Sequence, residues 1–114
     1  MSIIESSDTA GEILLDAAEI IEDKGWIQNA WQNEHGVCLE QAVLNAIGNR
    51  VGVKSENWRQ SAVNKADLFI RCMQRLGFNH DAAGKKLYLG RQYNDTKGRT
   101  KQHVLKRLRK AAGR

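Results

Sequence analysis

Apolar residues recur every three to four positions along most of this chain, the period of an amphipathic helix. The spacing predicts a first helix over Ala10–Lys24, which a capping box of Thr9 and Glu12 would open. It predicts a second helix over Leu39–Ile47, and Gly48 is expected to end it.

The same period continues in the second half of the chain. A third helix is expected from about residue 56 to residue 76, with Ser55 as its N-cap. Residues 79–90 are expected to hold a short helix, and Arg91–Arg99 to form a polar loop. Thr100 would then cap a last helix that runs close to the end of the chain.

Residues 26–39 break the helical period. Gln32–Gly36 is expected to form a turn, with a short extended piece on each side of it. The pattern therefore predicts an all-α fold: a compact single domain of about four helices, with a short extended or hairpin segment near residues 26–39. Residues 1–8 are expected to be a flexible N-terminus, and residues 9–114 the single helical domain.

Composition agrees with a small globular domain. The chain has 114 residues, of which 41% are hydrophobic, and this is enough apolar material for a core. No run of apolar residues approaches the length of a membrane span, and the acidic start of the chain lacks the features of a signal peptide. We expect a cytoplasmic protein without a membrane partner, in which Cys38 and Cys72 are reduced core thiols.

Charge is distributed unevenly along the chain. Residues 1–24 hold seven acidic residues and one lysine, whereas residues 97–114 hold eight basic residues and no acidic one. A basic helical face of this kind can contact phosphates or an acidic protein surface. The candidate binding residues in this region are Arg99, Lys101, Lys106, Arg107, Arg109 and Lys110. The alternative interpretation is that the acidic first helix and the basic last helix pack together and offset each other's charge.

Trp31 is a further candidate. It lies beside the polar turn, where an exposed tryptophan could anchor a partner protein. The more common arrangement, which we expect to be favoured here, is a tryptophan that belongs to the core.

Catalytic and metal-binding chemistry finds little support. His35 and Cys38 have the spacing of a ligand pair, but the only residues left to complete a zinc site are Cys72 and His80, which lack such a spacing. A cysteine nucleophile also requires a base that another group orients, and nothing in the sequence orients His35. We therefore expect no catalytic residue, no metal and no cofactor. A small metal-dependent or thiol enzyme centred on His35 and Cys38 is the remaining alternative.

Short motifs spread over the chain carry a family resemblance. They are Gly25–Trp26 with Gln28 and Ala30, then Gly36–Val37–Cys38, an alanine-rich helix, Tyr93–Asn94–Asp95 and Arg99–Thr100. In this order they resemble a family of small helical proteins of unknown function from actinobacteria and their phages. The resemblance covers about residues 12–112. Two departures are Tyr93, where the family usually has tryptophan, and Leu39–Glu40–Gln41, where it usually has small residues.

The resemblance implies a helical domain without a known activity, and a phage or host-accessory origin. It also suggests a structural role for the segment from Asn94 to Thr100. Asn94 and Asp95 are expected to bond the backbone two residues further on, and Arg99 to pair with Asp95 or with the acidic first helix. The alternative is a binding site built on this turn.

Taken together, the residues and the resemblance predict a non-catalytic accessory protein, from a phage or a phage-like element. It would bind a host macromolecule, most simply a protein, through its basic C-terminal helix. The alternative is a non-specific nucleic-acid-binding protein that uses the same helix, whose binding would fall steeply with salt.

Overall fold

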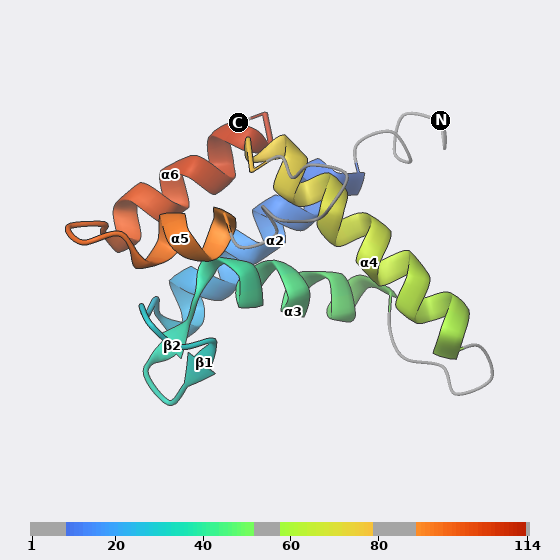
Figure 1. Ribbon diagram of the computed structural model, residues 1–114, viewed down its shortest axis with the longest axis horizontal. Coiled ribbons are helices and arrows are strands. Elements are labelled where there is room, and N and C mark those ends of the chain that lie inside the picture. Colours follow the sequence, from blue (N-terminus) through green and yellow to red (C-terminus); the bar gives the residue numbers. More distant parts are fainter. Residues whose placement is uncertain (1–8, 52–57, 79–88, 114) are drawn as a thin grey trace.

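The computed structural model describes residues 9–51, 58–78 and 89–113. Within them the chain forms five helices and one small hairpin (Figure 1). The elements are α2 (Thr9–Lys24), β1 (Gln32–Asn33), β2 (Gly36–Val37), α3 (Leu39–Val51), α4 (Trp58–Arg75), α5 (Leu89–Asp95) and α6 (Lys101–Ala111). The predicted all-α fold with a hairpin near residues 26–39 is confirmed. Among the described residues, no helix is both long enough and apolar enough to span a membrane.

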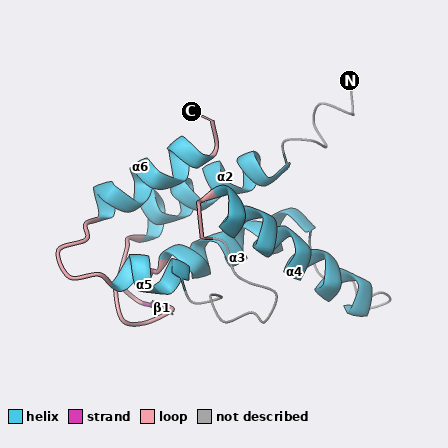
Figure 2. Cartoon of the chain, turned by 45° about the horizontal axis from the view of Figure 1, so that its top comes forward, coloured by secondary structure: helices cyan, strands magenta, loops and turns pink. Residues whose placement is uncertain are grey.

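Helix α2 is the centre of the packing, with α3, α4 and α6 around it (Figures 1 and 2). Its apolar stripe is buried, because that stripe faces these three helices. The fully buried large side chains include Ile13, Leu14, Ile21, Leu39, Ile47, Leu105 and Leu108. These residues are among the apolar positions that recur with the helical period in α2, α3 and α6, so that period identifies the buried face of each of these helices.

The hairpin is tighter than the sequence suggested. β1 and β2 pair antiparallel, with Gln32 opposite Val37 and Asn33 opposite Gly36. The strands thus occupy most of the predicted turn, and only residues 34–35 remain as the turn itself. On its other side Val37 forms a parallel bridge with Trp26, which attaches the segment after α2 to the hairpin.

A close backbone approach sets this geometry. Gly25 has φ +97°, and a Cβ atom placed on it would lie 2.4 Å from the carbonyl oxygen of His35. A Cβ atom placed on Gly36, which has φ +150°, would lie 2.4 Å from the carbonyl group of Gly25. Both positions therefore require glycine, since no side chain fits between the two segments.

Two predicted boundaries are wrong. Helix α3 continues past Gly48 to Val51, because an interior glycine lowers helix stability without ending a helix that is packed on one side. Residues 91–95 are helical as part of α5 and are not a polar loop. Here the tertiary contacts of Tyr93 and Asn94 outweigh weak local signals. The predicted flexible residues 1–8, the cap at Ser55 and most of the predicted helix over 79–90 lie outside the described residues.

Candidate functional site

Helix α6 presents the basic face that the sequence predicted. Its apolar side is buried through Val104, Leu105 and Leu108, whereas Lys106 and Lys110 are exposed on the other side. Thr100 caps the helix as predicted. Its hydroxyl oxygen accepts the N–H of His103, while Nδ1 of His103 accepts the N–H of Thr100, which completes a reciprocal capping box.

Two of the predicted binding residues pair with the first helix. Arg109 Nη2 lies 2.9 Å from Oε2 of Glu22, and Lys101 Nζ lies 3.9 Å from its Oε1. One carboxylate on α2 thus faces two cations that stand two turns apart on α6. For these two residues the structure agrees with the interpretation that the acidic and basic helices offset each other.

Arg107 forms hydrogen bonds at the C-terminal end of α4. Its Nε and Nη2 donate to the carbonyl oxygen of Leu76, just after the last turn of α4, at 3.1 and 2.7 Å. Its guanidinium also lies 5.0 Å from the ring centroids of Phe78 and Tyr93. In return Arg75 of α4 donates from Nε to the carbonyl oxygen of Ala111, at the end of α6.

The two helices therefore cap each other's C-terminus with an arginine. Free carbonyl groups and the negative end of the helix dipole favour a cation at this position. Arg107 was predicted as a partner-binding residue, and the structure places it in this internal contact.

Arg99 is also held within the protein. Its guanidinium lies 3.8 Å from the ring centroid of Tyr93, and its Nε donates to the Tyr93 carbonyl oxygen at 3.0 Å. The ion pair expected between Arg99 and Asp95 is not what the structure shows. Asp95 Oδ1 instead accepts the N–H of Asn29 at 2.8 Å, and its Oδ2 lies 3.9 Å from Arg91 Nε.

Lys106 and Lys110 remain on the outside of α6. Both side chains are exposed, and neither forms an ion pair with another described residue. With Gln102 and Arg109 they line a shallow surface depression along the helix. Lys110 also lines a groove between the ends of α4 and α6, where its neighbours are Arg75, Leu76, Gly77, Arg107 and Ala111. We call Gln102, Lys106, Arg109 and Lys110 the outer face of α6.

Asn94 is the main hydrogen-bonding residue where α5 packs against the segment after α2 and the start of α3. It is fully buried, and its Oδ1 accepts the indole N–H of Trp26 and, at 3.0 Å, the backbone N–H of Leu39. Its Nδ2 donates to the carbonyl oxygen of Ile27 at 3.0 Å and to Asp95 Oδ1 at 2.9 Å. One side chain thus ties α5 to the segment after α2 and to the start of α3.

Gln28 reinforces this junction. Its Nε2 donates to the carbonyl oxygens of Asn94 and Thr96, both at 2.9 Å. The sequence predicted local bonds from Asn94 to the next residues, whereas most of the observed partners lie 55 to 68 positions away. Hydrophobic periodicity treats asparagine as a surface residue, so it carried no signal of this role.

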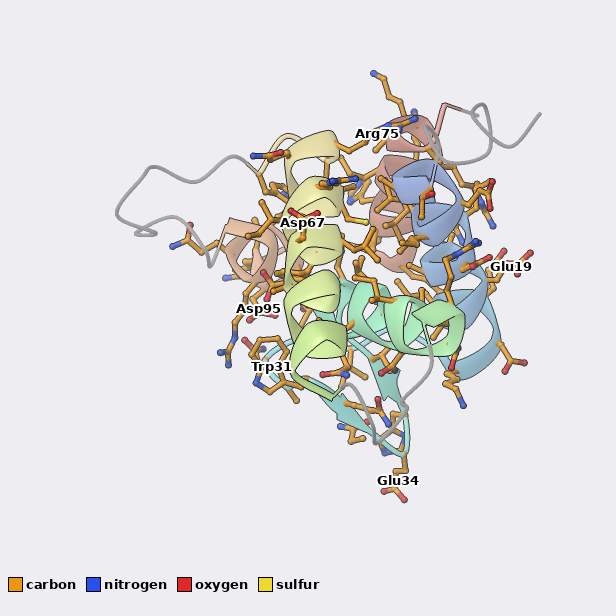
Figure 3. All side chains as sticks on the ribbon, turned by 90° about the vertical axis from the view of Figure 1, so that its right-hand side faces the viewer. Glu19, Trp31, Glu34, Asp67, Arg75 and Asp95 are labelled. Atoms are coloured by element: carbon orange, nitrogen blue, oxygen red, sulfur yellow. The ribbon has the colours of Figure 1, made fainter. Side chains whose placement is uncertain are left out.

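Trp31 lies on a different surface from the lysines. Its side chain is 41% exposed, and the guanidinium of Arg91 lies 4.8 Å from its ring centroid. In Figure 3, Trp31 lies on the same side as Asp95, far from Arg75 at the other end of the molecule. Figures 1 and 2 both place α5 between the hairpin and α6. The predicted anchor and the predicted basic face are therefore two separate surfaces.

The two thiols are internal. Cys38 and Cys72 are buried and unbonded to each other, as expected. Burial raises the pKa of the Cys38 thiol and raises that of Cys72 to about 12, the reverse of what a nucleophilic thiolate requires. His35 is exposed, and its Nε2 faces Glu34 at 3.6 Å. Within residues 9–51, 58–78 and 89–113, no group of three or more His, Cys, Asp or Glu side chains is arranged to hold a metal ion.

Comparison with known proteins yields one match. The family model described as Family of unknown function (DUF6197) matches residues 5–114. No curated protein and no solved structure matches the chain. The match confirms the expectation of a family without a described function.

Proposed function

The chain belongs to the Family of unknown function (DUF6197), and from this starting point we propose that it is a non-catalytic accessory protein that docks on an acidic surface of a host protein. The contact is made by the outer face of α6. The protein acts in the cytoplasm, and its origin is a phage or a phage-like element of actinobacteria.

The exposure of Lys106 and Lys110 carries this proposal. They stand one helical turn apart, so both ammonium groups project from the same side of α6. The neighbouring cations Lys101, Arg107 and Arg109 already contact Glu22 or a helix end. The two lysines are thus the cations on this helix that remain available to an acidic partner, and they would steer its approach.

The distribution of charge favours a protein partner over nucleic acid. Non-specific binding to a duplex comes from cations that neutralise phosphates, and its strength grows with the number of such contacts. The outer face offers only two unpaired lysines among the described residues. The adjacent helix α2 exposes Glu19, Glu22 and Asp23, which would repel a long phosphate backbone. Binding to nucleic acid through the same helix is the second candidate.

Trp31 supplies a second contact only to a partner that extends past α5. Such a partner would place an apolar or carboxylate group near Trp31 and Arg91, since aromatic and arginine side chains dominate the energy of many interfaces. A small partner would contact the outer face of α6 alone.

The test is capture of partners from a host lysate, with and without nuclease. The wild-type chain, Lys106→Glu/Lys110→Glu and a control, Lys24→Glu/Lys97→Glu, are compared. Both double variants change the net charge by the same amount at exposed lysines.

We expect one stoichiometric protein that survives nuclease, binds the wild type and the control, and is lost with Lys106→Glu/Lys110→Glu. Retention by Lys106→Glu/Lys110→Glu would contradict the assignment of the outer face. Captured material that disappears with nuclease would establish the nucleic-acid alternative instead.

A further inference from the structure

Glu40 is a buried carboxyl group in the first turn of α3. Only 3% of the residue is exposed, and its side chain lies against the backbone of α5. A Cβ atom placed on Gly90 would come within 2.8 Å of Glu40 Oε2, 3.0 Å of its Cγ and 3.2 Å of Met73 Sδ. The carboxyl group therefore sits where α3, α4 and α5 meet, and the absence of a side chain at Gly90 makes room for it.

The hydrogen bonding of this carboxyl group is incomplete. It accepts the backbone N–H of Arg91, while its Oε2 has no hydrogen-bond partner among the described residues. A buried carboxylate normally has partners for both oxygens, because an unsatisfied charged oxygen loses its hydration without replacement. The charged form of Glu40 therefore lowers the stability of the folded state.

Burial is the main cause of a raised pKa for the Glu40 carboxyl, and the negative charge of Asp95 adds to it. The backbone N–H and the positive charge of Arg91 act in the opposite direction without cancelling the rise. The charged groups that act on Glu40 are thus Arg91 and Asp95, both from α5, while Glu40 itself raises the pKa of the nearby Cys38 thiol. From α4, the described neighbour at this junction is the uncharged Met73.

We propose that Glu40 is a proton-sensitive latch between α3 and α5: a proton on its buried carboxyl group makes the latch hold α5 more firmly. The proton comes from solvent and binds Oε2, the oxygen that lacks a partner. Oε1 keeps the bond from the Arg91 N–H, so protonation removes the buried charge without breaking the contact. The latch also affects the surface around Trp31, because both contacts involve Arg91. The backbone N–H of Arg91 donates to Glu40, and its guanidinium lies over the indole ring of Trp31.

The direction of the pH effect follows from proton linkage. Between the ordinary glutamate pKa of about 4.3 and the raised pKa of Glu40, the folded protein binds more protons than the unfolded chain. Its contribution to stability is complete below the ordinary pKa and is lost as the pH rises through the raised one.

A direct test is a carboxyl-carbon NMR titration of Glu40 in the wild-type chain. We expect its midpoint above the ordinary glutamate pKa of about 4.3. A midpoint at or below that ordinary value would overturn the proposal, whatever the behaviour of any variant.

A second test compares urea unfolding of the wild type, Glu40→Gln and Glu19→Gln at pH 5.0 and pH 7.5. Glutamine keeps an oxygen for the Arg91 N–H but cannot be charged. We expect the midpoint of Glu40→Gln to exceed that of the wild type at pH 7.5 by a few tenths molar and to match it more closely at pH 5.0. Glu19→Gln should follow the wild type at both values. A Glu40→Gln midpoint below the wild type at pH 7.5, or an unchanged difference between the two pH values, would contradict the latch.

Discussion

Polar groups are held in opposite ways in two regions of the molecule, the surface around α6 and the junction of α5 with the hairpin. Around α6 the cations face Glu22, whose side chain is 49% exposed, so solvent screens these ion pairs. At the junction of α5 with the hairpin, Asn94 is fully buried and uncharged, yet it joins three segments of the chain. We therefore expect stability to follow the burial of polar groups and the number of their hydrogen bonds more closely than their formal charge.

The largest effect should come from Asn94→Ala. The substitution leaves the buried N–H of Leu39, the carbonyl oxygen of Ile27 and the indole N–H of Trp26 without their partner. We expect the free energy of unfolding to fall by about 3–4 kcal/mol, measured by urea denaturation.

Asn45→Ala is the matched control for this loss. Asn45 also bonds two side chains, those of Gln41 and Gln32, but these bonds lie near solvent. It should lower the free energy of unfolding by about 0.5 kcal/mol. Equal effects at Asn94 and Asn45 would remove the distinction between the buried junction and the surface.

Gly25→Ala should have the next largest effect. The new methyl group would collide with the His35 carbonyl oxygen at a positive φ, so the hairpin would have to move. We expect a loss of about 2–3 kcal/mol in the free energy of unfolding. Gly98→Ala, in the turn before α6, has a positive φ but nothing within 4 Å, and should cost only about 1 kcal/mol. An equal loss of stability in Gly98→Ala and Gly25→Ala would show that positive φ alone causes it, without a contribution from the His35 carbonyl oxygen.

Arg107→Ala tests the reciprocal capping of α4 and α6. It removes two hydrogen bonds to the Leu76 carbonyl oxygen and the contact with the rings of Phe78 and Tyr93. Thermal and urea unfolding should show a loss of about 1–2 kcal/mol. Lys106→Ala, one position earlier on the exposed side, should leave stability unchanged, and a comparable loss there would argue against the capping role.

Glu22→Gln should have the smallest effect. The exposed ion pairs with Lys101 and Arg109 contribute about 0.5 kcal/mol or less, because water and salt screen them. The difference from the wild type should vanish in about 1 M salt. A large loss that persists in salt would mean that these pairs hold α2 and α6 together.

Helical period predicted the parts of the fold that depend on one-sided burial. The stripes of α2, α3 and α6 are continuous, so the buried faces of these helices followed from sequence. Helix α5 was missed from Arg91 onward, because Arg91, Gln92, Asn94 and Asp95 are polar and resemble a loop. Its backbone is helical because Asn94 finds long-range partners and Tyr93 packs against the core.

The candidate site, like the fold, could be predicted only in part from the sequence. The sequence identified α6 as the basic helix and Thr100 as its cap, and it raised the pairing of acidic and basic helices as an alternative. It could not assign a separate task to each cation. Arg99 and Arg107 look equivalent to Lys106 in sequence, yet the first two contact rings and carbonyl oxygens inside the protein.

The helical class, the inward faces of α2, α3 and α6 and the unequal charge of the two ends of the chain could all be predicted from the order of residues. These properties depend on residues within one helix or one segment, so the period and the composition suffice. The role of Asn94, the burial of Glu40 and the separation of Trp31 from the outer face of α6 depend on how the segments pack. Each of these depends on which distant segment lies next to a polar group, and that neighbour sets its hydrogen bonds and its access to water.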